Sequence, residues 1–126
     1  MMTRSYLFIN AMLYSLLAIW CTIQHNRTSA ASGFETLNNS GHSEYLVIYG
    51  GLQLGLAVFY AHLGSQTALH RTGVLFSVML YVPIVVYRVM TILHFSPVSK
   101  ITLGTGALEL GLLVGAVALL IKTPAG

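Results

Sequence analysis

The sequence predicts an all-α integral membrane protein: a single transmembrane domain, residues 1–126, in which four spans form a bundle of two helical hairpins. Of its 126 residues, 56% are hydrophobic and only 7% are charged, whereas soluble domains carry about 25% charged residues. Crossing the hydrocarbon core takes about 20 mostly apolar residues. Windows of that kind cover residues 6–23, 45–63, 74–93 and 101–121. They use most of the chain, so we expect no soluble domain beside them.

Each window can be justified in order along the chain. The first contains Tyr14 and Trp20, and its length favours an uncleaved membrane helix over a signal peptide, whose apolar region is shorter. The second follows a polar loop rich in asparagine and serine, residues 25–43. The third and fourth are separated only by residues 94–100. Such a short connection predicts that they are antiparallel neighbours.

Two internal similarities suggest that the hairpins are repeats of one another. Residues 50–56 (GGLQLGL) match residues 106–112 (GALELGL), and the Met-Leu-Tyr of residues 12–14 recurs at residues 79–81. Both hairpins would begin on the same side of the membrane, so the repeat would be parallel, with an approximate two-fold axis along the membrane normal. Chance similarity is the alternative, because apolar helices use few residue types.

Two charges lie inside the apolar windows, Arg88 in the third and Glu109 in the fourth. The chain has only three acidic and six basic residues, and a charge at the centre of a membrane helix costs about 2.5–3.5 kcal/mol on insertion scales. At a rise of about 1.5 Å per residue, both lie roughly 8–12 Å from the nearest end of their spans. We therefore expect them to contact each other. The matching positions of the first hairpin are Cys21 and Gln53.

A buried ion pair needs further hydrogen bonds, because attraction alone does not offset the lost hydration of two charges. Gln53 lies slightly deeper than the pair, Tyr49 lies one turn above Gln53 on the same face, and Tyr81 shares a face with Arg88. Their side chains are the expected partners. Asn10 lies nearer the other side of the membrane, and we assign it to a separate contact.

Small residues favour a second, close-packing face on two of the helices. Gly51, Gly55, Gly111 and Gly115 fit the small-xxx-small pattern of membrane helix interfaces. On a helix they lie roughly opposite Gln53 and Glu109. This face would pack against a neighbour in the same chain or against a second copy in a homodimer.

Charge distribution predicts the orientation of the chain. Arg4, Arg71 and Lys122 would share one side with the N-terminus, and Arg27 and Lys100 would face the other. Positive residues concentrate on the cytoplasmic side of membrane proteins. We therefore expect both termini in the cytoplasm.

No cofactor, metal or nucleic acid is expected. The basic residues are few and scattered, which disfavours nucleic-acid binding. His42 and Glu44, with His25 and His94, would lie near one surface, but they lack the tight spacing of metal ligands. The single cysteine, Cys21, cannot form an internal disulfide.

One family resemblance rests on short motifs: Glu44 followed by Tyr49-Gly50-Gly51 and Gly55, then Arg88, and later Glu109-Leu110. With these motifs the chain, from residue 33 onward, resembles an uncharacterised family of small four-span bacterial membrane proteins, a domain of unknown function. The resemblance implies a four-helix bundle in a bacterial inner membrane. It implies no activity or substrate.

Three functions follow as hypotheses. The leading one is binding of a lipophilic small molecule whose polar head is recognised by Arg88, with Glu109, Gln53, Tyr49 and Tyr81 around it; membrane lipids are the expected surroundings. The second is an isomerase or hydrolase acting on such a ligand, with Glu109 as general acid or base and Arg88 or Tyr49 stabilising an oxyanion. The third is a structural subunit in which the polar cluster only locks the bundle.

Overall fold

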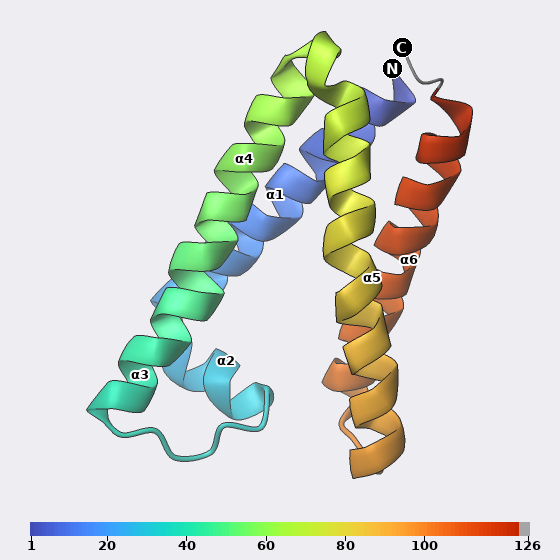
Figure 1. The fold of residues 1–126 in the computed structure, drawn as a ribbon. Helices are drawn as coiled ribbons and strands as arrows, with labels where there is room; N and C mark the ends of the chain where they lie inside the picture. The colour runs from blue at the N-terminus through green and yellow to red at the C-terminus, as the bar shows by residue number, and fades with distance from the viewer. Residues whose placement is uncertain (124–126) are drawn as a thin grey trace.

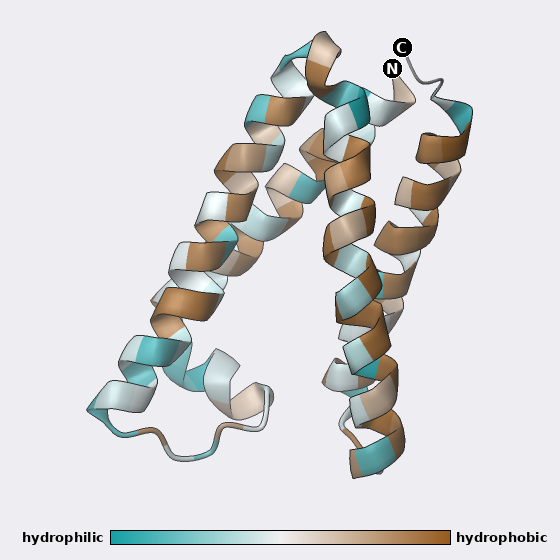
Figure 2. Ribbon diagram, viewed as in Figure 1, coloured by the Kyte–Doolittle hydropathy of each residue, from teal (hydrophilic) through white to brown (hydrophobic). Residues whose placement is uncertain are grey.

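The computed structural model describes residues 1–123, and within them the chain is helical with no strand. Four helical stretches are long and apolar enough to cross a membrane. This confirms the prediction of four spans and is consistent with an integral membrane protein. Figure 2 shows apolar residues along these stretches and hydrophilic residues gathered at their ends. The stretches are Met2–Ile23, Asn39–Ser65, Thr67–Phe95 and Lys100–Lys122.

The elements follow one another in the order shown in Figure 1. The first span is α1, and the second runs from α3 through a π-helical segment into α4. A 3₁₀ turn, Thr67–Leu69, leads into α5, and α6 completes the chain. The helix bounds are α1 Met2–Ile23, α2 His25–Ala31, α3 Asn39–Leu46, the π-helix Val47–Leu52, α4 Gln53–Ser65, α5 His70–Phe95 and α6 Lys100–Lys122.

Polar caps explain why the second and fourth spans begin where they do. The Asn38 side chain accepts a hydrogen bond from the Gly41 amide, and the Ser99 side chain accepts one from the Thr102 amide. Each cap satisfies one of the free amide groups in the first turn of its helix. The second helix therefore starts at Asn39, earlier than the predicted window at residue 45.

The four long helices form two packed pairs. Helix α1 packs most extensively along α4, and α5 along α6. The beginning of α1 and the end of α6 lie at one end of the bundle, here called the terminus end, and α2 with residues 96–99 lies at the other, the loop end (Figure 1). The pairs approach each other at the terminus end and diverge toward the loop end.

The apolar core lies where the two pairs meet, near the terminus end. Gly73 of α5 allows the close approach, because a Cβ there would lie 2.8 Å from a Leu7 methyl group. A side chain at this position would push α5 away from α1. The core cluster consists of Leu7, Ala11, Tyr60 and Leu63.

Neutral hydrogen bonds join α1 to α5 beside this core. The Tyr81 hydroxyl donates to Asn10 Oδ1 at 2.5 Å, and the Tyr14 and Tyr81 hydroxyls lie 2.8 Å apart. Asn10 is fully buried and Tyr81 nearly so. Asn10 therefore belongs to a contact separate from Arg88 and Glu109, as predicted. The prediction did not include its partner, Tyr81, which the approach of α1 to α5 brings beside it.

Two further hydrogen bonds cross between the pairs. The Tyr60 hydroxyl of α4 lies 2.8 Å from the Ser77 hydroxyl of α5. The Tyr6 hydroxyl of α1 donates to the Leu112 carbonyl of α6 at 2.8 Å. The terminus end is therefore held together by tyrosine hydroxyls as well as by apolar packing.

Candidate functional site

Arg88 and Glu109 form a bidentate ion pair, as the sequence predicted. Arg88 Nε lies 2.9 Å from Glu109 Oε2, and Arg88 Nη2 lies 2.8 Å from Glu109 Oε1. The arginine side chain is 31% exposed and the glutamate 15%. It is the only ion pair within residues 1–123. Two parallel N–H···O bonds between a guanidinium and a carboxylate fix both orientation and charge balance.

A glycine makes room for this pairing. Arg88 lies on α5 and Glu109 on α6, and the arginine stem crosses α6 at Gly106, where a Cβ would lie 3.2 Å from Arg88 Cγ. Gly106 is three residues before Glu109, so both face the same side of α6. The stem can therefore lie against the helix and bring the guanidinium to the carboxylate.

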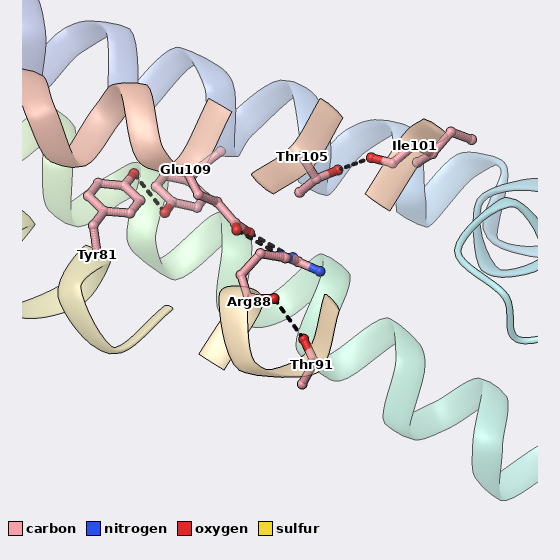
Figure 3. Close-up of polar contacts among 7 residues, drawn as sticks. Tyr81, Arg88, Thr91, Ile101, Thr105 and Glu109 are labelled. Carbon is pink, nitrogen blue, oxygen red and sulfur yellow. Dashed lines mark hydrogen bonds and ion pairs between the residues drawn. The ribbon is translucent and has the colours of Figure 1, made fainter. Parts of the chain in front are cut away.

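The pairing leaves hydrogen-bond donors of Arg88 unused. Nη1 makes no hydrogen bond with residues 1–123, since both bonds to Glu109 use Nε and Nη2. Figure 3 shows this third nitrogen pointing away from the carboxylate, toward the loop end. Arginine carries five N–H donors in a rigid fork, so Nη1 can bind an acceptor without disturbing the pair.

These donors face a cavity between the two helix pairs. The outer cavity, nearer the loop end, has a volume of about 720 Å³. The end of α1, helix α2 with the loop after it, the π-helix, the second half of α5 and the start of α6 supply its walls. Its lining includes Cys21, Gln24, Arg27, Tyr49, Arg88, Thr102 and Thr105.

A second, inner cavity continues toward the terminus end and has a volume of about 500 Å³. Leu17, Trp20, Tyr49, Arg88 and Thr105 line both cavities, so the two are contiguous. Glu109, Gln53, Tyr14 and Tyr81 line the inner one only. Its remaining walls are apolar: Leu13, Leu16, Ile84, Leu108 and Leu112. Mostly apolar walls with a few fixed polar groups are typical of ligand sites.

The structure brings the predicted site residues to one cavity but not into one hydrogen-bond network. Gln53 makes only a long contact, 3.5 Å, from Nε2 to the Ile48 carbonyl, and its shielded Oε1 has no partner among residues 1–123. Tyr81 is bonded to α1 instead. Within the described residues, no hydrogen bond joins Gln53, Tyr49 or Tyr81 to Arg88 or Glu109. The cavity separates α4 from that pair, so the expected bonds do not form.

Sequence reasoning missed the backbone geometry at Tyr49. The residue lies in the π-helix Val47–Leu52, a wider turn that is frequent at functional sites. Its ring stacks on Tyr45 with centroids 4.5 Å apart, and Phe34 packs edge-on against both rings. This aromatic cluster closes one side of the outer cavity. The adjacent Gly50-Gly51 pair was the only hint of unusual backbone in the sequence.

The glycines of the predicted small-residue face do not pack inside the chain, with one exception. Within residues 1–123, nothing lies within 4 Å of a Cβ built at Gly51, Gly55 or Gly111, whereas at Gly115 the Tyr6 ring lies 3.3 Å away. Close contacts between helices fall instead at Gly50, Gly64, Gly73 and Gly106.

The histidines near the loop end pair without forming a metal centre. His25 and His42 meet edge to face with ring centroids 5.3 Å apart. Nowhere in residues 1–123 do three or more potential metal ligands gather.

Comparison with known proteins leaves the family of this chain unassigned. No family model matches the chain, and comparison with curated proteins and with solved structures finds no significant match. The resemblance to small four-span bacterial membrane proteins therefore stays a prediction.

Proposed function

We propose that this protein binds a lipophilic small molecule between its two helix pairs, with Arg88 hydrogen-bonding the ligand's polar head. The observation that carries the proposal is the position of Arg88 on the wall of both cavities, with Nη1 unused by its partner Glu109. The apolar walls of the inner cavity suit a hydrocarbon chain, and the fixed donors suit an oxygen acceptor. Fatty acids, quinones and isoprenoids all belong to this class.

The position of the ion pair favours binding over a purely structural role. Arg88 and Glu109 join α5 to α6, which already pack along each other, and they do not link the two helix pairs. The contacts that do link the pairs are the tyrosine bonds at the terminus end. A cluster whose task was to lock the bundle would be expected to cross between the pairs.

The same geometry favours binding over acid–base catalysis. Both carboxylate oxygens of Glu109 accept hydrogen bonds from Arg88, and these bonds occupy the atoms that would take up a substrate proton. A general base must have an oxygen within reach of the substrate proton. Glu109 is better placed to hold the guanidinium in position.

The parallel repeat belongs to this proposal, because matched positions of the two halves line the cavities. Tyr14 and Tyr81, which correspond in the repeat, are hydrogen-bonded to each other. Three more corresponding pairs line the inner cavity: Leu17 and Ile84, Gln53 and Glu109, and Tyr49 and Thr105. Such an arrangement is expected of a site near the axis relating the halves.

The repeat can be tested by moving the ion pair. The double variant Arg88→Cys/Glu109→Gln should lose the ligand. Adding Cys21→Arg and Gln53→Glu should restore ligand retention, because the ion pair then lies at the matching positions of the first hairpin. A quadruple variant that folds but retains no more ligand than the double variant argues against equivalent halves.

We further propose that the terminus end faces the cytoplasm of a bacterial inner membrane, because Arg4, Arg71 and Lys122 belong to that end. A C-terminal green fluorescent protein fusion, which should fluoresce only from the cytoplasm, tests the orientation.

The outward-facing Gly51, Gly55 and Gly111 suit a homodimer. In native mass spectrometry, Gly55→Leu should lower the fraction of dimer.

The deciding experiment compares lipophiles retained by the purified protein. We expect extracts of the wild-type protein to contain a bound lipophile, and Arg88→Met to lose it while remaining folded. Arg71→Met is the matched control, because Arg71 also has a partner, the Thr123 carbonyl, at the opposite end of the bundle. Equal retention by Arg88→Met and wild type would reject the proposal.

A further inference from the structure

The charges around the outer cavity are unbalanced. Arg27 and Arg88 line it, and no acidic residue does. Glu109 neutralises Arg88. Arg27 forms no ion pair or side-chain hydrogen bond with residues 1–123 and is exposed. The lining therefore carries one uncompensated positive charge, at Arg27.

Arg27 lies at the level where a lipid head group would be expected. It belongs to α2, beyond the end of α1 at the hydrophilic loop end (Figure 2). Arg88 lies deeper, seven residues before the end of α5 at Phe95, which at the rise of an α-helix is about 10 Å. The cavity thus presents a full positive charge at its mouth and a charge-balanced donor farther in.

From this gradient we infer that the site selects an anionic amphiphile: Arg27 pairs with a phosphate head group, Arg88 Nη1 donates to a carbonyl below it, and the acyl chain fills the inner cavity. This inference rests on the proposed function and adds the ligand class. A guanidinium fork matches phosphate geometry in bidentate fashion. Gln24 and Thr102 add polar groups to the same lining. The apolar walls of the inner cavity include five leucines, and they disfavour a second charge on the ligand because burial of an unpaired charge is costly.

The test uses two single-chain lipids that share an acyl chain and an ester carbonyl. Oleoyl lysophosphatidylglycerol carries an anionic phosphodiester, and monoolein has none. In titrations followed by native mass spectrometry, we expect the wild-type protein to prefer the phospholipid by about tenfold, the factor that one hydrogen bond to a charged group supplies. Arg27→Gln should abolish this preference and leave monoolein binding unchanged, whereas Arg88→Met should weaken both lipids.

Lys100→Gln is the matched control, since Lys100 is a cation at the same end but does not line the cavity. Because Lys100 does not line the cavity and salt at physiological ionic strength weakens interactions between exposed charges, this variant should keep the preference. Equal binding of both lipids by the wild type, or equal loss of preference in Lys100→Gln and Arg27→Gln, overturns the inference and leaves the proposed function intact. Binding of neither lipid by folded wild-type protein also overturns the inference, whereas the proposed function is rejected only if Arg88→Met and wild type retain equal amounts of lipophile.

Discussion

Replacing Arg88 and Glu109 together by apolar residues separates the stability of the bundle from its function. Arg88→Met alone removes two charge-assisted hydrogen bonds and leaves a carboxylate that is only 15% exposed without a partner. Breaking a fully buried pair costs about 3–5 kcal/mol, and an exposed pair is worth about 0.2–1 kcal/mol. With side-chain exposures of 31% and 15%, we expect Arg88→Met to lower the free energy of unfolding by about 2–3 kcal/mol, between those limits.

The double variant Arg88→Met/Glu109→Leu should recover most of that loss. It leaves no unpaired charge, and replacing a buried ion pair by apolar residues of similar size is close to neutral. We expect its free energy of unfolding to lie within about 1 kcal/mol of the wild-type value. Retention of the co-purified lipophile should nevertheless be lost, because the Nη1 donor is gone.

The assay is unfolding of delipidated protein in mixed micelles, followed by helical circular dichroism, together with mass spectrometry of lipophiles from parallel preparations. Delipidation matters because a bound ligand raises apparent stability. If the double variant loses as much stability as the two single variants added together, the pair is not energetically coupled and the reasoning fails. If it is stable and still retains wild-type amounts of lipophile, Arg88 does not bind the head group.

Two further substitutions test the surroundings of the pair. Tyr81→Phe removes both hydrogen bonds of that hydroxyl to α1. It should lower the free energy of unfolding by about 1–3 kcal/mol, because it leaves a buried acceptor unpaired. Tyr87 is exposed and has no side-chain hydrogen bond within residues 1–123, so Tyr87→Phe should change the free energy of unfolding little, and equal effects of the two variants would contradict the proposed network. Gly106→Leu should displace the Arg88 stem and reduce lipophile retention as far as Arg88→Met does. Gly104→Leu is its control, because a Cβ at Gly104 meets nothing within 4 Å among residues 1–123. A loss of retention common to both variants would show that bulk on α6, not displacement of Arg88, is responsible.

Composition and depth were enough to predict the spans and the central contact. Length and apolarity marked the four helices, and the equal depths of Arg88 and Glu109 on neighbouring spans predicted their ion pair. Both inferences use position along a helix axis. Axial position follows from sequence because the rise per residue is nearly constant.

Rotation about the helix axis was harder to predict. In a water-soluble helix the apolar stripe marks the core, but in a membrane helix the lipid-facing side is apolar too. The sequence therefore did not show that Tyr81 faces Asn10 or that Gly55 faces outward. The π-helix around Tyr49 was also missed, since one extra residue in a turn leaves no clear mark in composition.

Neutral and charged polar groups are divided between the two ends of the bundle, and this division favours a ligand at the charged end. Where the helix pairs meet, tyrosine hydroxyls bond to Asn10, to Ser77 and to a backbone carbonyl, and burying such neutral groups costs less than burying charges. Neutral bonds thus link the pairs. Arg88 and Glu109 lie instead where the pairs diverge, within one of them and beside a cavity, with Nη1 facing that space. A polar head group that accepts a hydrogen bond from Nη1 would use the one donor group that the ion pair leaves free.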